Sequence, residues 1–534
     1  MPAPYVPVLE NPRGGRTFYL SPDGDDEADG RTLQTAWQTL RRVDAVRLKP
    51  GDRVLLRGGA RFPGTLSIGQ GDAGNARKPV VIESYGTGRA AIAAVGSHGI
   101  EVHNTSGIVI RNLVLTGNVK AFRKQDGISL VSDLPGRRKL PYVRVTGVDV
   151  SGFRNGIRMH GGPGGSGFRD VVLRDCTVHN NQEAGVVSDG PAFDATAPVY
   201  AHEDITVSKV TAFRNDGDPR AADRNTGSGI VLGSVRHGVV EDSDAHANGK
   251  SSSAQAAEGP EGIWTYDSTR MVLQRNVAYA NRTGSRVDGG GFGLDNNVSH
   301  SLVQYNLSYD NDGAGFLAYS AVPNHAHTGN TIRYNISRDN ARKLEDYGGI
   351  VALGSWVSNL AIYQNTVLAT AHGSVRAPAL RLQPNLDAVS VRNNVFATDG
   401  PPLVAAGGHF DTSEVAMQGN DYHAPKGWNL EWGDGRYTDL AAWRQASGQE
   451  LQGPRATGTS ADPCLTEVPV STNGPGVGRT GTRRGALVTR CAQALAGAAV
   501  QLSTVGVDPG PVDYFGTPLT GSPAIGAVQP APKA

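Results

Sequence analysis

The chain has 534 residues, of which 70 are glycine and 38% are hydrophobic, and its formal net charge is +1. A chain this close to neutrality offers no basic surface for nucleic acid or for an anionic membrane. It contains no apolar run of about 18 residues, so no membrane-spanning helix is predicted. The composition excludes collagen and disorder, and it suits short strands joined by many turns.

The first residues, MPAPYVPVLENPRGG, lack the apolar core of a signal peptide. We expect either an intracellular protein or one whose leader has been removed. We favour the second, which implies an extracellular or periplasmic location.

The next segment predicts one amphipathic helix near 34–47, followed by a strand after the turn at Pro50-Gly51. We expect this helix to cap the N-terminal end of a repeat, because uncapped coils expose strand edges. Its apolar residues at helical spacing are Trp37, Leu40, Val43 and Val46.

Glycines that open short strands recur at intervals close to 29 residues through most of the chain. A fixed period of this size indicates a solenoid in which each unit is one coil. The units alternate apolar and polar residues with period 2 and show no helical periodicity. The strand-opening residues are Gly99, Gly127, Gly156, Gly185, Gly229, Gly262, Gly291, Gly315 and Gly349.

Asparagines form a second register, with steps of 30, 29, 30, 29 and 26 residues. Each lies between two short apolar runs, as in VLQRNVAYA. Because asparagine tolerates the left-handed region, we expect each one to form a one-residue turn with positive φ. Asparagines stacked at one corner favour a right-handed parallel β-helix. The register consists of Asn276, Asn306, Asn335, Asn365, Asn394 and Asn420.

The predicted fold is therefore all-β, with a right-handed parallel β-helix over 61–425. A tail (1–16) and an N-terminal cap (17–60) precede it, and a C-terminal cap (426–534) follows. Near 437–450 the segment YTDLAAWRQASGQE is again helical and is expected to lie over the last coil. The rest of the C-terminal cap is rich in Gly, Pro and Thr and predicts irregular loops.

Three cysteines are present. Cys176 lies in an apolar strand and is expected to be a buried free thiol. Cys464 and Cys491 bracket a loop outside the repeat. A disulfide would stabilise this loop in an oxidising compartment, and two unrelated free thiols are the alternative.

Several segments together resemble secreted bacterial proteins of the pectate-lyase-like superfamily. They are FYLSPDGDD, AWQTL, LKPGDRVLLRGG, the asparagine coils, AAWRQASGQE…ADPCL and DYFG…AIGA. The resemblance implies the β-helix fold and a carbohydrate-active enzyme, because that superfamily holds polysaccharide lyases, glycoside hydrolases and uronate epimerases. It matches no specific family: the polygalacturonase signature and the W-x-D-H of pectate lyases are absent. The segment GGHF, ending at His409 and Phe410, falls outside the strand series.

Alternate residues of each glycine-led strand are expected on opposite faces, with the first and third after the glycine inward and the second and fourth outward. The outward positions include Trp264, Tyr266 and Tyr319, beside Asp295 and Asp189. Exposed rings with carboxylates suit sugars, which present apolar faces and hydroxyl rims. The alternative is that the preceding loops bury these rings as a satellite core.

Acidic residues concentrate on two neighbouring coils, in AEGPEGIWTYDS and VDGGGFGLDNN. Alignment of Ile263 with Phe292 makes Asp267 a diagonal neighbour of Asp295. Unpaired like charges at close range raise one pKa, as a general acid requires. Asp295 and Asp267 are thus the first candidates for a glycosidase pair, unless they cap turns. The rival candidates are Glu258, Glu261 and Asp288.

The competing chemistry is β-elimination on a uronate polymer, which needs a cation or acid group and a base. Arg158 and His160 share one outward face, and Asp189 follows on the next coil. Hydrolysis requires no cofactor, whereas an elimination assisted by Ca²⁺ needs six to eight oxygen ligands. Oxygens for such an ion are offered by Glu258, Glu261, Asp288 and Asp295. The face has few lysines or arginines to match a polyuronate, so hydrolysis ranks first.

The sequence thus predicts a glycoside hydrolase acting on a polysaccharide or oligosaccharide. A polysaccharide lyase is the first alternative, and a non-catalytic carbohydrate-binding or surface structural solenoid is the second. Neither nucleic acid nor membrane insertion is expected, and the sugar, the linkage and the oligomeric state stay open. The predicted substrate-binding residues are Trp264, Tyr266, Tyr319, Arg158, His160 and Asp189.

Overall fold

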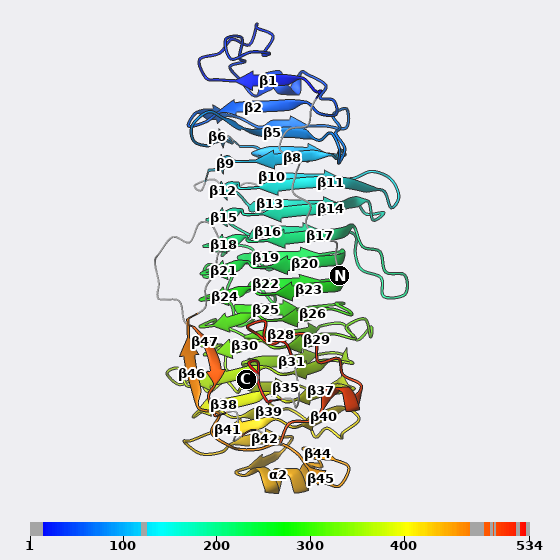
Figure 1. Cartoon of the computed structure of the whole chain (residues 1–534), viewed down its shortest axis with the longest axis vertical. Helices are drawn as coiled ribbons and strands as arrows, with labels where there is room; N and C mark the ends of the chain where they lie inside the picture. The colour runs from blue at the N-terminus through cyan, green and yellow to red at the C-terminus, as the bar shows by residue number, and fades with distance from the viewer. Residues whose placement is uncertain are drawn as a thin grey trace. The chain divides into compact units, whose positions relative to one another are not determined.

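The computed structural model describes residues 14–94, 96–118, 125–469, 485–491, 495, 498–519 and 524–529. These residues form two compact units. The first runs to Asp244 and includes Ser251–Ser253, and the second holds Ala245–Lys250 and the described residues from Ala254 onward. In each unit, short parallel strands stack in successive layers (Figure 1).

The first unit has three parallel sheets, here named A1, B1 and C1, and each coil gives one strand to each sheet. A1 contains β1 (Thr17–Leu20), β2 (Arg53–Arg57), β5 (Val80–Tyr85), β8 (Ile108–Arg111), β11 (Lys139–Thr146), β14 (Gly167–Arg174), β17 (His202–Ser208) and β20 (Val235–Glu241). B1 contains β3 (Arg61–Pro63), β6 (Ala90–Ala93), β9 (Leu113–Thr116), β12 (Asp149–Ser151), β15 (Thr177–His179) and β18 (Thr211–Phe213). C1 contains β4 (Leu66–Ile68), β7 (Ile100–His103), β10 (Asp126–Ser132), β13 (Asn155–Gly161), β16 (Ala184–Asp189) and β19 (Ser228–Gly233).

The second unit follows the same plan, and β21 (Asp244–His246) begins at the last residue before it. A2 contains β23 (Thr269–Gln274), β26 (Leu302–Gln304), β29 (Thr331–Arg333), β33 (Ala361–Tyr363), β37 (Val389–Arg392) and β40 (Val415–Gln418). B2 contains β24 (Val277–Tyr279), β27 (Leu307–Tyr309), β30 (Ile336–Arg338), β34 (Thr366–Thr370), β38 (Val395–Asp399) and β41 (Asp421–His423). C2 contains β22 (Glu261–Tyr266), β25 (Gly290–Leu294), β28 (Phe316–Ser320), β31 (Ile350–Gly354), β35 (Leu380–Leu382), β39 (Val404–Ala406), β42 (Leu430–Trp432) and the antiparallel β43 (Gly435–Tyr437).

Few elements lie outside these sheets. The helices whose bounds the structure describes are α1 (Arg41–Asp44), α2 (Leu440–Ser447) and the 3-10 helix η1 (Leu502–Val505). The short strand pairs are β32 (Val357–Ser358) with β36 (Leu386–Asp387), β44 (Leu451–Gln452) with β45 (Arg455–Ala456), and β46 (Leu465–Val468) with β47 (Ala486–Thr489). The all-β parallel solenoid predicted from the repeat is confirmed.

The register of the glycine-led strands agrees with the sequence alignment. Ile263 pairs with Phe292, and Phe292 pairs with Phe316. The inward positions are buried in both units, so the predicted alternation is confirmed on that face. The first of these columns contains Ile128, Ile157, Val186, Ile230, Ile263, Phe292, Phe316 and Ile350.

The asparagine register of the second unit forms a ladder at one corner. Each amide Nδ2 donates to Oδ1 of the next asparagine at 2.9–3.1 Å. Each backbone N–H donates to the same oxygen at 2.9–3.0 Å. The ladder ends on Glu450, whose Oε1 accepts from Asn420 Nδ2 at 2.8 Å. Stacked asparagines are thus confirmed.

The expected positive φ of these asparagines is wrong, because the residue before each one makes the turn. Those residues have φ between 50° and 72°. The ladder asparagine instead keeps an orientation in which its amide satisfies buried backbone groups. The left-handed residues are Arg275, Tyr305, Tyr334, Gln364, Asn393 and Gly419.

The helix predicted near 34–47 is mostly wrong, since only α1, four residues long, is helical. Trp37 lies in an extended segment that pairs with β1, and its N–H donates to Tyr19 O at 2.8 Å. The indole stacks on Phe18 with the ring centroids 4.9 Å apart. Strand pairing and ring stacking therefore override helical spacing here. Leu40 and Val43 are buried, and Val46 is half-buried.

At the other end of the sequence, α2 lies within the predicted helical segment. Its cap residue Asp439 accepts from Ala442 N–H through its side chain, and Gly448 ends the helix in the left-handed region. Trp443 is fully buried, with its ring centroid 5.5 Å from those of Tyr422 and Trp432. The helix therefore packs on residues of the last coil.

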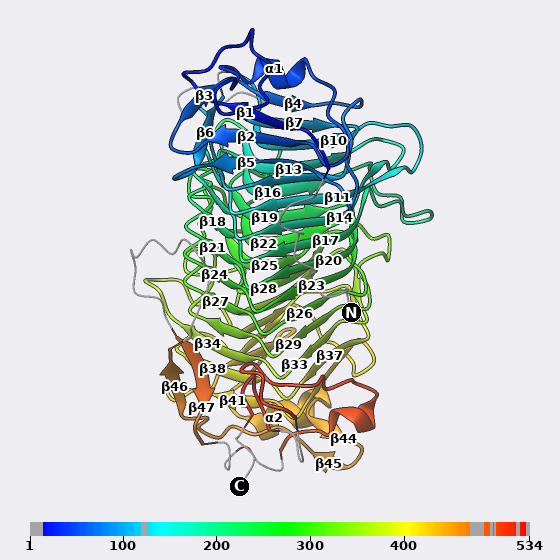
Figure 2. The same cartoon turned by 45° about the horizontal axis from the view of Figure 1, so that its top comes forward.

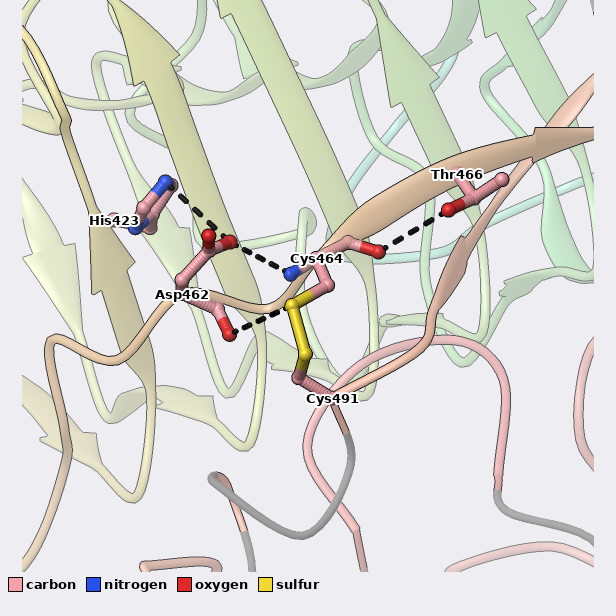
Figure 3. The surroundings of a disulfide bond; sticks show 5 residues. All are labelled: His423, Asp462, Cys464, Thr466 and Cys491. Atoms are coloured by element: carbon pink, nitrogen blue, oxygen red, sulfur yellow. Dashed lines mark hydrogen bonds and ion pairs between the residues drawn. A yellow bond between two sulfur atoms is a disulfide. The ribbon is translucent and has the colours of Figure 1, made fainter.

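The hairpin of β46 and β47 runs steeply across the direction of the B2 strands in both views (Figures 1 and 2). Ala486 and Leu487 pack on Leu307 and Ile336 of B2. A disulfide joins Cys464 to Cys491 at the base of this hairpin (Figure 3). The disulfide alternative is thus confirmed, and Cys176 is a buried free thiol.

Candidate active site

Two carboxyl groups flank strand β25. Asp288 lies before the strand in the left-handed region (φ 57°), and Asp295 follows its last residue. Both side chains are half-buried. Burial raises the pKa of Asp288 to about 6. Burial, and then repulsion by Asp288, raise the pKa of Asp295 to about 8. The two groups therefore differ in their affinity for a proton near neutral pH, as an acid and a base must.

The hydrogen bonds to these two groups are unequal. Asp288 Oδ2 accepts from Gly259 N–H at 2.7 Å, and its Oδ1 accepts from the Tyr347 hydroxyl at 3.0 Å. Asp295 Oδ1 accepts from Asn296 N–H at 2.6 Å. Neither carboxyl has an ion-pair partner within the part of the chain that the structure describes. Few hydrogen-bond donors therefore stabilise the ionised forms of these two carboxyl groups, and ionisation of both at once is unfavourable.

Glu261 brings a third carboxyl to the same site, at the first position of β22. It is 4% exposed. Burial raises its pKa well above the ordinary value, and repulsion by Asp288 and Asp295 adds to the shift. The cluster of Glu261, Asp288 and Asp295 is called the acid cluster below.

Asp267 and Glu258 lie beside the acid cluster. Asp267 occupies a left-handed turn (φ 46°), and its Oδ1 accepts from Asn297 Nδ2 at 2.6 Å. This bond favours a turn-stabilising role, and Asp267 raises the pKa of Asp295 less than burial, Asp288 and Glu258 do. Glu258 is exposed, and its charge raises the pKa of both Asp288 and Asp295. Asp288 therefore influences the pKa of Asp295 more strongly than Asp267 does.

Tyr347 is a site residue that the sequence analysis missed. It lies 59 positions beyond Asp288, and its hydroxyl both donates to Asp288 Oδ1 and accepts from Asp288 N–H at 2.9 Å. Arg381 Nε in turn donates to Tyr347 O at 3.1 Å. Tyr347 lies in a loop outside the strand register, so no periodic signal could have found it.

The expected exposure of Trp264 is wrong, since this residue is only 5% exposed. Its ring centroid lies 5.5 Å from that of Tyr266, which is half-buried. Tyr319 is also half-buried and belongs to a satellite core, the alternative considered for these rings. The alternation of residues along a strand predicts which side chains point outward, but it does not predict which other segments cover them. That core contains Ala314, Leu317 and Val351, with Tyr319, Tyr347 and Leu353 packed against it.

The first unit contains the other predicted binding residues. Arg158 Nε donates to Asp189 Oδ2 at 2.9 Å, and His160 Nδ1 contacts Asp189 Oδ1. Arg158 Nη2 lies 3.2 Å from His160 Nδ1. Although burial opposes it, these contacts hold the pKa of Asp189 below its usual range. The three residues are thus brought together, but as a mutually bonded network.

No group of three or more His, Cys, Asp or Glu in the described residues is arranged to hold a metal ion. The calcium site suggested by Glu258, Glu261, Asp288 and Asp295 is therefore not found there. The described helices include none long and apolar enough to cross a membrane.

Comparison with known proteins finds one matching family and one similar curated protein. A family described as a right-handed beta helix region matches residues 223–396. A lacto-N-biosidase of Bifidobacterium longum subsp. longum is 24% identical over 481 residues, which cover 72% of this chain and 29% of that protein. The chain thus spans less than a third of the length of this relative.

Two solved structures share the fold. A GH136 lacto-N-biosidase from Eubacterium ramulus superposes with a TM-score of 0.54 and 18% identity, over 79% of this chain and 68% of that one. The structure of XylC with xylose superposes with a TM-score of 0.51 and 10% identity, over 96% and 98% of the two chains. At these identities the likeness establishes the right-handed parallel β-helix fold. It does not identify the substrate, which must be inferred from the residues of the candidate site.

Proposed function

We propose that the protein is a glycoside hydrolase acting on an oligosaccharide, with Asp288 and Asp295 as its catalytic carboxyl pair. The observation that carries this proposal is the pair itself, whose pKa values of about 6 and about 8 keep one group ionised and the other protonated near neutral pH. Glycoside hydrolysis requires two carboxyl groups in these opposite states. The similarity to a lacto-N-biosidase supports the same reaction class.

Tyr266 and Tyr319 are the proposed sugar contacts of this site. Both are half-buried, so part of each residue remains accessible. The charges of Asp295 and Asp288 act on Tyr319, which supports its position beside the pair. Trp264 is buried, and we propose that it packs against the ring of Tyr266 and does not itself stack on sugar. A ring with an apolar face and a polar rim matches these contacts.

The lyase alternative has less support. Arg158 and His160, its candidates for uronate binding and proton abstraction, are both engaged by Asp189. The acid cluster would repel a uronate, because its own carboxyls have no cation partner among the described residues. Elimination is therefore treated as an outcome of the test below.

The test is a screen of neutral and acidic oligosaccharides and polysaccharides with the purified protein. We expect new reducing ends without ultraviolet absorbance from an unsaturated uronate. Products with that absorbance would replace the hydrolase by the lyase. Saturable binding without cleavage of any glycan would instead make the protein a carbohydrate-binding solenoid.

The proposed organisation keeps the tail (1–16), the caps (17–60 and 426–534) and the β-helix (61–425). Burial of Trp443 against the last coil supports a capping role for α2. The disulfide between Cys464 and Cys491 supports an extracellular or periplasmic location, because such bonds persist in oxidising compartments. Secretion is tested by locating the protein in the producing cell and by mass spectrometry of the bonded peptides.

A further inference from the structure

The carboxyl group of Glu261 is buried without hydrogen bonds. Neither Oε1 nor Oε2 has a hydrogen-bond partner in the described part of the chain, and the residue is 4% exposed. A buried polar side chain without partners is rare and destabilising, so it calls for a reason beyond folding.

Two glycines make the space that this carboxyl occupies. A Cβ atom at Gly293 would lie 2.0 Å from Glu261 Oε2, and one at Gly290 would lie 2.9 Å from Oε1. Gly293 is the register partner of Trp264 on the neighbouring strand. Glu261 therefore extends over β25 into a space that any other residue at 293 would close.

The groups that face Glu261 are acidic or neutral. Asp288 and Asp295 repel its charge, and Tyr347, held on Asp288, presents a phenol. Glu258 adds negative charge from the preceding loop through its effect on Asp288 and Asp295. No cation acts on Glu261 among the described residues. A charge in this position would be buried, unpaired and repelled, which is more costly than keeping the proton.

We propose that Glu261 is a positioning residue that works as a neutral carboxylic acid: it fills the space over Gly290 and Gly293 of β25, next to the proposed catalytic pair, and excludes water without adding a third negative charge. The kinetic part of this inference rests on the proposed hydrolase function. In this role the shape of the side chain matters and its ionisation does not. A glutamine, which has the same shape and no charge, can therefore replace it.

The kinetic test compares Glu261→Gln, Glu261→Ala and the matched control Glu450→Gln. We expect Glu261→Gln to keep kcat/KM within about threefold of wild type at neutral pH, whereas Glu261→Ala loses about tenfold or more because its cavity admits water. A loss of more than tenfold in Glu261→Gln would overturn the proposal. Such a loss would mean that an ionised Glu261 is required, as for a general base. Glu450→Gln should leave the kcat/KM of the folded fraction unchanged.

The second measurement needs no substrate. Infrared spectra of protein with isotope-labelled glutamate should show a protonated carboxyl band at pH 7 that disappears in Glu261→Gln and persists in Glu450→Gln. Absence of this band in wild type would overturn the proposal, even if Glu261→Gln failed to fold. If no glycan is cleaved by wild type, the proposed function fails, while the infrared band still decides the state of Glu261.

Discussion

Glu450 and Glu261 are both buried glutamates of the second unit, 0% and 4% exposed, yet their surroundings are opposite. Glu450 closes the asparagine ladder and accepts five hydrogen bonds, whereas Glu261 accepts none in the described residues. The donors to Glu450 are Gly419 N–H, Asn420 N–H and Nδ2, and the hydroxyls of Tyr422 and Thr457.

We infer that the difference separates polar groups that build the fold from those that serve the proposed chemistry. A buried carboxylate surrounded by donors stabilises the native state, because each donor would otherwise be unsatisfied. A cluster of carboxyls with few donors costs stability, and such a cost persists where function requires it. The ladder corner should therefore govern stability, and the acid cluster should govern activity.

The largest effect is expected from the catalytic pair. Asp295→Asn and Asp288→Asn keep the size of the side chain but remove its proton exchange, so each should lower kcat by about 10²–10⁴. Steady-state hydrolysis of a cleaved glycan measures this. Asp267→Asn is the matched control and should stay within about tenfold of wild type, because Asn297 already holds Asp267 in a turn. Equal losses in all three variants would contradict the choice of pair.

Substitutions in the asparagine ladder should lower the stability of the protein and not its catalytic rate. Asn365→Ala removes the oxygen that accepts from both Asn335 N–H and Asn335 Nδ2, leaving two buried donors unsatisfied. We expect a loss of about 2–4 kcal/mol in the free energy of unfolding, measured by chemical denaturation. The exposed amide of Gln445 in α2 provides a control, since Gln445→Ala should change stability by less than about 0.5 kcal/mol. A ladder variant as stable as this control would remove the distinction.

The pH profile of kcat/KM should report the acid cluster. One member of the pair must be ionised and the other protonated, so activity should fall below about pH 6 and above about pH 8. Each limb should approach a tenfold change per pH unit, and the two apparent values belong to the pair as a whole. An activity that is flat from pH 4 to pH 9 would rule out this assignment.

The smallest effect is expected from Tyr347→Phe. This change deletes the hydroxyl that donates to Asp288, so the pKa of Asp288 should rise and the acid limb should move to higher pH. We expect a loss of about 5–10-fold in kcat/KM at neutral pH, consistent with one hydrogen bond to a charged group. Tyr363 lies on sheet A2, and its hydroxyl donates to Asp508 O. Tyr363→Phe loses this bond and should leave the pH profile of kcat/KM unchanged. An unshifted acid limb in Tyr347→Phe would exclude its positioning role.

The repeated parts of the fold could be predicted well from the sequence, because the stacked coils of a solenoid place equivalent residues at a fixed period. The inward column and the asparagine ladder follow from period alone. The helix near Trp37 did not form, because backbone pairing with β1 outweighs helical spacing in so short a segment. Glu450 could not be predicted as the end of the ladder, since it lies outside the repeat.

Part of the candidate site could be predicted from the sequence. Register brought Asp288, Asp295 and Glu261 to one place, but spacing does not reveal hydrogen-bond partners, so the choice between Asp267 and Asp288 stays a prediction for the variants above. Tyr347 and the burial of Trp264 depend on how loops cover the outward face. Loops carry no periodicity, so these features required the structure.

The most direct test of the contrast between ladder and acid cluster is the unfolding free energy of Asp295→Asn against pH. Because the folded pKa of Asp295 is raised to about 8, its contribution to stability is present below about pH 4 and lost as pH rises through about 8. At pH 9 the wild type carries this unfavourable charge and the variant does not. We therefore expect Asp295→Asn to gain about 4 kcal/mol relative to wild type between pH 5 and pH 9, while remaining inactive. A variant that is less stable than wild type by the same margin at both pH values would show that Asp295 serves the fold, and would contradict the account.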